Sequence, residues 1–207
     1  IATIYAEITD AAALPALGPA VDAIVATGHE AGGWVGEDTA YILAQRLLPV
    51  CERPLLLRGG VGTHACAALA LSGAAGVVLD DQLLLLDESP LNETQQARIS
   101  RLNGAETRLY GQAADAPCRL HAPPGSAALQ AAGELSSQLE TGAIDHARFR
   151  TGLGALSGWS EGQLMPLGQA VGLAAIVFAI VGVFSMGWLL AAWLFREAAR
   201  GERASGV

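Results

Sequence analysis

Two glycine-rich segments are the parts of this sequence best suited to binding chemistry. The first spans residues 28–36 and contains four glycines, and the second, Arg-Gly-Gly-Val-Gly, spans residues 58–62. The second segment opens a predicted helix, and the free backbone N–H groups at a helix start bind anions. Glycine lets such backbone groups approach a ligand closely. We therefore predict an anion-binding cradle made by the N–H groups of Gly59, Gly60 and Gly62.

Both segments follow strand-like runs, which places them at one edge of a predicted sheet. The β-branched and apolar runs that predict strands are 1–8, 21–27, 54–57 and 76–79. Apolar strands that alternate with helices are typical of a helix-covered parallel sheet, so the fold class is α/β. Functional groups gather at the carboxyl ends of such strands, and Asp80 and Asp81 follow the last one. Glycines also make ordinary turns, but two such loops at strand ends favour a ligand site.

Composition excludes several classes of function. The 207-residue chain is 52% hydrophobic and 15% charged, so bulk disorder is excluded, and its net charge of −8 argues against a nucleic-acid surface. All 12 basic residues are arginines, which excludes Schiff-base catalysis and a Walker-type phosphate lysine. Cys51, Cys66 and Cys118 lack CxxC spacing, so we expect free thiols in a reducing, cytoplasmic compartment and no metal site.

The middle of the chain, residues 87–165, is predicted to be an excursion from the sheet without catalytic spacing. The pattern predicts a polar helix or loop over 87–103, a surface linker over 104–128, an amphipathic helix over 129–140 and a helical turn over 144–149. His121 and His146 are lone histidines, which are more often surface residues than ligands.

A hydrophobic segment lies near the end of the sequence. No charged residue occurs between Gly162 and Phe195, and residues 173–195 form the core of this run. A helix of about 20 apolar residues spans a bilayer, and arginines follow the segment as on a cytoplasmic flank. Two interpretations stay open, a transmembrane helix or helices packed on a barrel. The lack of a polar stripe favours the transmembrane helix.

Five motifs follow one another in an order that a known family shares. They are Gly-His-Glu-Ala-Gly-Gly at 28–33, Arg-Gly-Gly-Val-Gly at 58–62, Gly-Ala-Ala-Gly-Val-Val-Leu-Asp at 73–80, Glu-Ser at 88–89 and Pro-Leu-Gly-Gln at 166–169. Together they resemble the nitronate monooxygenase, or 2-nitropropane dioxygenase-like, family. The likeness is strongest to versions fused to polyketide-synthase-type multienzymes.

The resemblance implies a TIM barrel that carries FMN, of which this chain supplies the C-terminal half, strands five to eight. In such barrels the loops after strands seven and eight bind the phosphate, which here are 58–62 and 80–81. Gly32 and Gly33 then edge the flavin and the substrate pocket. Because Ile1 already lies in a strand-like run, we expect a fragment of a longer protein. The implied organisation is a half barrel over 1–112, a linker and helical excursion over 113–165, and a hydrophobic helix with a basic tail over 166–207.

Two positions depart from the pattern of this family. Nitronate-oxidising members carry a histidine, proposed as the base, directly after the Glu-Ala-Gly-Gly run, and this sequence has Trp34 there. An indole cannot accept a proton, so His29 is the one candidate base that we name. Asp80 and Asp81 stand where the family often has Gly-Thr. Two carboxylates repel a phosphate dianion unless they point away from it or hold a cation.

The sequence thus predicts an FMN-dependent oxidoreductase of nitronate monooxygenase type that acts on a small-molecule nitronate or acyl-type substrate. Its expected partners are the remainder of the barrel or a polyketide or fatty-acid multienzyme, and not nucleic acid. Two alternatives stay open. The missing family histidine favours a catalytically silent barrel, and the hydrophobic segment favours a module that binds a phosphorylated ligand and is anchored to a membrane through residues 173–195.

Overall fold

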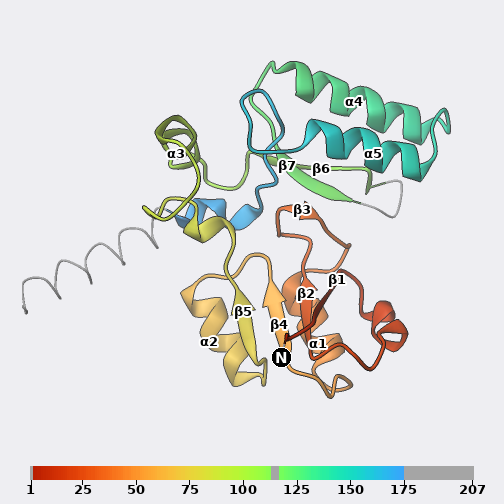
Figure 1. The fold of residues 1–207 in the computed structure, drawn as a ribbon, viewed down its shortest axis with the longest axis vertical. Coiled ribbons are helices and arrows are strands. Elements are labelled where there is room, and N and C mark those ends of the chain that lie inside the picture. The colour runs from red at the N-terminus through yellow and green to blue at the C-terminus, as the bar shows by residue number, and fades with distance from the viewer. Residues whose placement is uncertain (1, 113–116, 175–207) are drawn as a thin grey trace, which may run out of the picture.

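The computed structural model describes residues 2–112 and 117–174, which form two lobes (Figure 1). One lobe is built on a four-stranded sheet near the N-terminus, and we call it the parallel-sheet lobe. The other is built on a three-stranded sheet with two helices, and we call it the antiparallel lobe. Between them lie a helix, α3 (Glu93–Ile99), and the segment 165–171.

All four strands of the first sheet are parallel, as the sequence predicts. They are β1 (Tyr5–Ile8), β2 (Ala23–Thr27), β4 (Leu55–Arg58) and β5 (Gly76–Val78), in the spatial order β1-β2-β4-β5. Each strand overlaps one of the predicted runs. The common direction of the strands brings their carboxyl ends to a single edge, where the glycine-rich segments begin.

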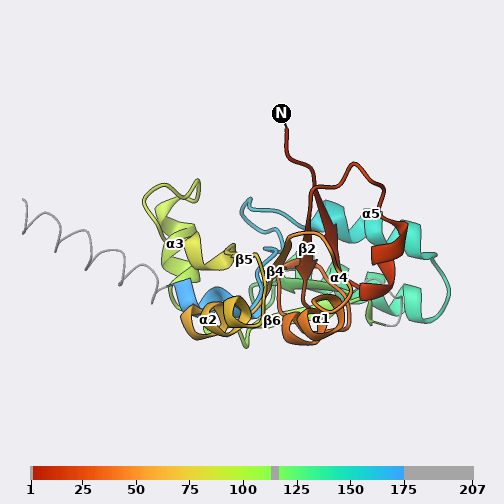
Figure 2. The ribbon, with the colours of Figure 1, turned by 90° about the horizontal axis from the view of Figure 1, so that it is seen from below.

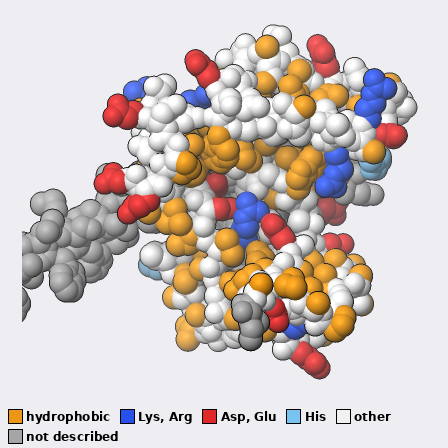
Figure 3. All heavy atoms as spheres, in the orientation of Figure 1, with side chains coloured by type: hydrophobic (Ala, Val, Ile, Leu, Met, Phe, Trp, Pro, Cys, Tyr) orange, Lys and Arg blue, Asp and Glu red, His pale blue; other side chains and the backbone are white. Residues whose placement is uncertain are grey.

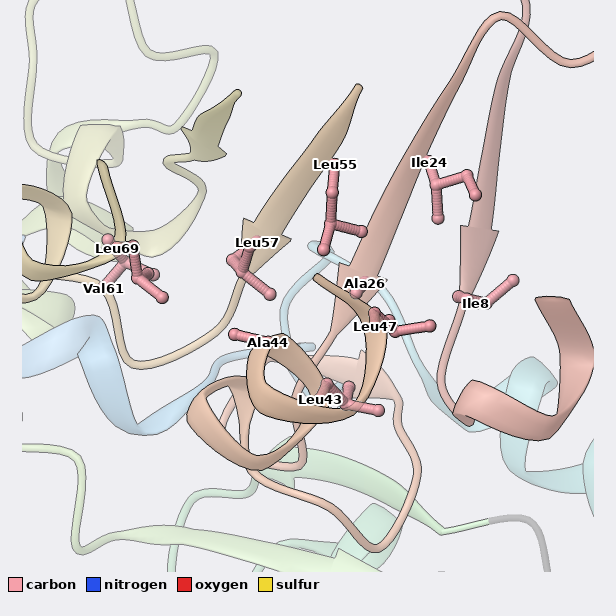
Figure 4. Packing of buried hydrophobic residues seen from close by; sticks show 10 residues of the cluster. All are labelled: Ile8, Ile24, Ala26, Leu43, Ala44, Leu47, Leu55, Leu57, Val61 and Leu69. Carbon is pink, nitrogen blue, oxygen red and sulfur yellow. The ribbon is translucent and has the colours of Figure 1, made fainter. Parts of the chain in front are cut away.

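Two helices, α1 (Ala40–Leu47) and α2 (Thr63–Leu71), lie on one side of this sheet (Figure 2). Helix α1 begins at Ala40, because the Thr39 hydroxyl accepts a hydrogen bond from the Ile42 N–H and caps the helix. A short 3-10 helix, Ala11–Ala16, follows β1. Figure 4 shows the core that results, with leucines of α1 packed against apolar side chains of the strands.

The opposite face of the sheet carries apolar side chains that these helices do not cover. Its residues alternate with the core residues along each strand and include Tyr5, Val25, Leu56 and Val78. Tyr5 is 57% exposed, and the other three are half-buried. Figure 3 shows hydrophobic side chains gathered over this lobe, and a hollow band between the lobes where acidic and basic side chains meet.

The antiparallel lobe takes its first strand from the first glycine-rich segment. The strands β3 (Gly33–Trp34), β7 (Cys118–His121) and β6 (Thr107–Tyr110) pair in that order. Helices α4 (Ala127–Glu140) and α5 (His146–Leu156) pack beside each other on this sheet. The predicted helix over 129–140 is therefore confirmed, and the helical turn expected at 144–149 is part of a longer helix.

The prediction of a surface linker over 104–128 is wrong. This stretch contains β6 and β7, and every residue of β7 is buried because that strand is paired on both sides. His121, expected at the surface, is only 4% exposed. The polar residues of β7 do not give the apolar pattern of a buried strand in the sequence. In the fold, hydrogen bonds to neighbouring segments satisfy these residues. The boundary expected at residue 112 falls between two strands that pair with each other.

The segment that follows the antiparallel lobe returns to the parallel-sheet lobe. Leu167 and Val171 pack against Ile99 of α3, and a 3-10 helix, Gln169–Leu173, ends the described chain. Within residues 2–112 and 117–174, no helix has the length and apolar character needed to cross a membrane. The predicted hydrophobic helix over 173–195 lies outside the described residues, apart from its first two positions.

Candidate functional site

Three loops and one distant segment meet at the carboxyl edge of the parallel sheet. The Gly28 N–H donates to the Arg58 carbonyl at 2.8 Å, which joins the ends of β2 and β4. The Gln169 N–H donates to the Glu30 carbonyl at 2.8 Å. The Gly168 N–H donates to Asp81 Oδ2 at 2.6 Å. The structure therefore brings together four of the five motifs, those at 28–33, 58–62, 73–80 and 166–169.

The segment 59–62 has the geometry of an anion cradle. Gly59 and Gly60 adopt φ values of +105° and +63°, which side-chain-bearing residues rarely adopt. Gly62 then caps α2 without any side-chain hydrogen bond. The first N–H groups of a helix have no partner within the helix, so this end of α2 offers free donors and the positive end of its dipole. The segment presents backbone rather than side chains, which fits a phosphate group.

The loop 28–36 uses its glycines differently, because other chain segments lie against them. A Cβ atom at Gly28 would overlap the backbone of Ala40, and one at Gly32 would overlap the Pro166 carbonyl. Gly33, with φ +84°, has more space around it and begins β3. Gly32, predicted to edge the flavin, is thus packed against the returning segment.

Arg58 holds the carboxyl edge together from the uncovered face of the sheet. Its guanidinium group lies 3.0 Å from Glu7 Oε1 on β1 and 2.8 Å from Asp80 Oδ2 after β5. It also donates to the Gly32 carbonyl at 3.0 Å. Glu7 accepts a further hydrogen bond from the Thr27 hydroxyl at 2.6 Å. The sequence analysis does not identify Arg58 or Glu7 as site residues, although an arginine directly before two glycines at a strand end is a usable signal.

The two aspartates after β5 are both engaged by neighbouring groups. Asp80 pairs with Arg58 and accepts the Asp81 N–H at 2.7 Å. Asp81 is buried, and its burial together with the charge of Asp80 raises its pKa to about 7. The hydrogen bond from Gly168 and the charge of Arg58 act in the opposite direction. Near neutral pH, one carboxylate is ion-paired and the other is partly protonated, so both repel an anion less than free carboxylates do.

Gln82 connects this region to the cradle. It is buried, donates to the Val61 carbonyl at 2.6 Å and accepts the Asp80 N–H at 3.1 Å. One side chain therefore fixes the cradle segment relative to the end of β5. No local pattern in the sequence identifies this glutamine.

His29 is held by both lobes. Its carbonyl accepts a hydrogen bond from Arg119 of β7 at 2.8 Å, and its Nδ1 lies 3.7 Å from Glu30 Oε2. Glu30 is itself fixed by the Ala40 N–H at the start of α1, at 3.1 Å. A histidine next to an oriented carboxylate has the components of a general base.

Trp34, at the position of the family histidine, packs against the core of the antiparallel lobe. Its ring lies in the antiparallel lobe, with the Arg150 guanidinium stacked over it at 4.5 Å from the ring centre. This is the geometry of a cation–π contact between β3 and α5.

Comparison with known proteins identifies the family. The family model described as nitronate monooxygenase matches residues 1–122, more than half of the chain. The chain belongs to the nitronate monooxygenase family. This finding confirms the resemblance, and the matched residues include the first four of the five motifs.

Solved structures of other proteins share the fold. FabK from Thermotoga maritima superposes with a TM-score of 0.65 at 19% identity, over 90% of this chain and 64% of FabK. Nitroalkane oxidase from Streptomyces ansochromogenes gives 0.62 at 18% identity, over 87% of this chain and 56% of the oxidase. The enoyl reductase domain of MlnA, from the macrolactin biosynthesis cluster of Bacillus amyloliquefaciens, gives a TM-score of 0.54 at 12% identity. This match covers 75% of this chain and 51% of that domain.

This chain spans less than two thirds of the length of these relatives. At such identities the likeness shows the fold alone, which is that of TIM-barrel enzymes. A search of curated proteins finds no match.

Proposed function

We propose that this chain binds the phosphate of FMN at residues 59–62 and belongs to an FMN-dependent oxidoreductase of nitronate monooxygenase type. The observation that carries the proposal is the cradle, in which two consecutive left-handed glycines lead into the uncapped N-terminus of α2. This cradle lies after the third strand of the sheet, β4, which is the seventh in barrel numbering. When bound, FMN supplies the electron-accepting chemistry.

In the proposed arrangement, β1, β2, β4 and β5 are strands five to eight of a TIM barrel. The uncovered face supports this proposal, because a barrel encloses the alternating side chains that are half-exposed here. Each edge strand, β1 and β5, pairs on one side only within the described residues. The remaining barrel strands, or the multienzyme that contains them, are the proposed partners of this chain.

Residues at the carboxyl edge have separate proposed roles. Asp80 and Asp81 shape the edge beside the phosphate site while Arg58 and partial protonation limit their repulsion. Gly32 and Gly33 position the chain next to the flavin rather than contacting it through side chains. His29, whose Nδ1 lies 3.7 Å from Glu30 Oε2, accepts the α-proton of a nitroalkane, which leaves the nitronate as the species to be oxidised.

A second candidate function is the reduction of an acyl-type substrate within a polyketide or fatty-acid multienzyme. One observation favours it. Trp34 occupies the position of the family histidine and is committed to a stack with Arg150, so no proton acceptor lies there. The two candidates share the flavin site and differ in the substrate.

The flavin site is tested with Gly60→Val in the full-length natural protein. A side chain at φ +63° is strained, and it would crowd Glu30 and the phosphate approach. We expect bound FMN, measured by flavin absorbance after gel filtration, to be lost. Gly142→Val is the matched control, because Gly142 has φ +72° and no neighbour within 4 Å. Equal FMN content in Gly60→Val and the natural protein would contradict the assignment.

The substrate is tested separately. The FMN-loaded natural protein is assayed for oxidation of 2-nitropropane, for oxidation of propane-2-nitronate and for NADH-dependent reduction of an enoyl thioester. Loss of 2-nitropropane turnover in His29→Gln, with propane-2-nitronate turnover retained, supports the first function and the role of His29 as its base. Thioester reduction without nitronate turnover supports the second and removes His29 from its proposed role. Neither turnover, with FMN bound, would contradict both.

A further inference from the structure

A cavity lies between α3 and the antiparallel lobe, and the loops of the carboxyl edge do not line it. It has a volume of about 1010 Å³ and is lined by α3, by β6 and β7, and by the start of α4. None of its lining residues comes from the glycine-rich segments or from the two aspartates after β5. Its size is at the upper end of ordinary small-molecule sites, roughly 300–1,000 Å³. The cavity is therefore a separate candidate site.

Three arginines line this cavity without an ion pair to a described residue. They are Arg98, Arg101 and Arg108, and no salt bridge within residues 2–112 and 117–174 includes any of them. Two acids also line it. Glu106 is already engaged, because its carboxylate accepts the N–H groups of Asn103 and Gly104 at 3.1 Å. In a chain of net charge −8, a lining in which guanidinium groups outnumber carboxylates is an anion-attracting surface.

The second acid, Glu93, lies in the first turn of α3, where the helix dipole favours a carboxylate. It is exposed and forms no salt bridge within the described residues. The lining as a whole carries three positive and two negative side chains, so its charge is opposite in sign to that of the chain.

The buried histidine of the cavity adds a donor. His121 is 4% exposed, and its Nε2 lies 3.3 Å from Arg98 Nη2. A guanidinium group can only donate, so Nε2 accepts and the neutral ring carries its proton on Nδ1. Burial and the Arg98 charge lower the pKa of His121 despite the opposing effect of Glu106, which keeps the ring neutral. Its Nδ1 is buried and has no hydrogen-bond partner of good geometry among the described residues, although the Glu106 backbone next to the ring raises the pKa.

The rest of the lining is apolar. Leu102 and Leu129 line the cavity, together with alanine and proline side chains of α3 and of the segment after β7. Most of the accessible lining surface belongs to apolar atoms. A small hydrophilic anion would leave this surface unused, whereas a ligand with an apolar body would bury it.

We infer that this cavity binds an amphipathic organic phosphate, with its anionic group on Arg98, Arg101 and Arg108 and its apolar body between α3 and α4. Charge-assisted hydrogen bonds from arginine suit a phosphate, which guanidinium groups contact with two parallel donors. The inference is independent of the FMN site, because the two sites share no residue.

The test uses hexyl phosphate as the probe and isothermal titration calorimetry on the natural protein loaded with one equivalent of FMN. We expect hexyl phosphate to bind more tightly than either hexanol or inorganic phosphate, since each lacks one half of the recognised group. Affinity should fall as salt is added. Hexanol binding as tightly as hexyl phosphate, or no binding of hexyl phosphate, would overturn the inference.

Substitutions locate the binding. Arg101 and Arg108 are exposed, so the double variant Arg101→Gln/Arg108→Gln should fold normally and lose about tenfold or more in affinity for hexyl phosphate. Arg148→Gln is the matched control, because Arg148 is an exposed arginine outside the cavity. Equal effects of the double variant and the control would show non-specific attraction and overturn the inference. FMN content in the double variant should be unchanged, which separates this result from the FMN test.

Discussion

The two glycine-rich loops at the carboxyl edge have similar compositions and opposite structural roles. In the packed loop, residues 28–36, glycines leave room for the backbones of other segments. In the cradle, residues 59–62, Gly59 and Gly60 provide a left-handed turn before α2. The number of glycines in a loop therefore does not tell whether it binds a ligand. What distinguishes the two loops is how close the neighbouring atoms are. A Cβ atom at Gly28, Gly32 or Gly36 would overlap backbone atoms, whereas one at Gly59, Gly60 or Gly62 would meet its nearest neighbour at 3.0–3.4 Å.

The largest effect should come from Gly32→Ala in the packed loop. The new methyl group would overlap the Pro166 carbonyl and crowd the Gly168 N–H, and overpacking of this kind costs about 1–3 kcal/mol. We expect a lower free energy of unfolding, measured by urea denaturation. Gly60→Ala is the comparison, since it meets only the Glu30 side chain and adds backbone strain of about 1–2 kcal/mol. A greater loss in Gly60→Ala would break the distinction between the loops.

An intermediate effect should come from Asp81→Asn, which changes how the free energy of unfolding depends on pH. Asp81 accepts the Gly168 N–H, and Gly168 lies against the packed loop. The pKa of Asp81 is raised from 3.8 to about 7 by burial and by Asp80. Between these values the folded chain binds more protons than the unfolded chain, so stability falls as pH rises. The slope reaches at most about 1.4 kcal/mol per pH unit.

Asp81→Asn removes this titration and keeps an oxygen acceptor for the Gly168 N–H. We expect the variant to lose less stability than the natural protein between about pH 4 and pH 7, measured by urea denaturation at several pH values. Asp87→Asn, at an exposed carboxylate, should retain the natural pH dependence. If Asp81→Asn retains it as well, Asp81 does not titrate in this window.

The smallest effect should come from Arg150→Gln on α5, because the guanidinium group of Arg150 stacks on Trp34 of the packed loop. The substitution removes the cation over the Trp34 ring and should cost about 0.5–1 kcal/mol of stability. Thermal unfolding monitored by tryptophan fluorescence can measure it. Arg148→Gln, two residues away on α5 and exposed, should have no such effect. Equal losses in both would mean that the stack contributes nothing.

Local signals explain what the sequence predicts correctly. The four parallel strands are short apolar runs, and α1 begins at Thr39 because a threonine hydroxyl can cap a helix. The family also follows from the sequence, since its motifs are continuous stretches. Each of these features depends on neighbouring residues, so a single sequence is sufficient to identify it.

Features that depend on distant residues are the ones that the sequence does not predict. The strand Cys118–His121 contains two basic side chains, and only its pairing with β3 and β6 makes burial favourable. The network of Arg58 depends on the register that places Glu7 and Asp80 beside it. Gln82 is likewise defined by its contact with Val61. These contacts result from topology, which no local pattern encodes.

The hydrogen bond between Gly168 and Asp81 joins residues that are 87 positions apart, and that between Arg119 and His29 joins residues 90 positions apart. Contacts of such separation form slowly, because a long loop must close before they stabilise the fold. During synthesis the parallel strands emerge well before the segment 166–169. Completion of the carboxyl edge must therefore wait until the antiparallel lobe has been made, so loading of the proposed cofactor would be a late event in the biogenesis of the protein.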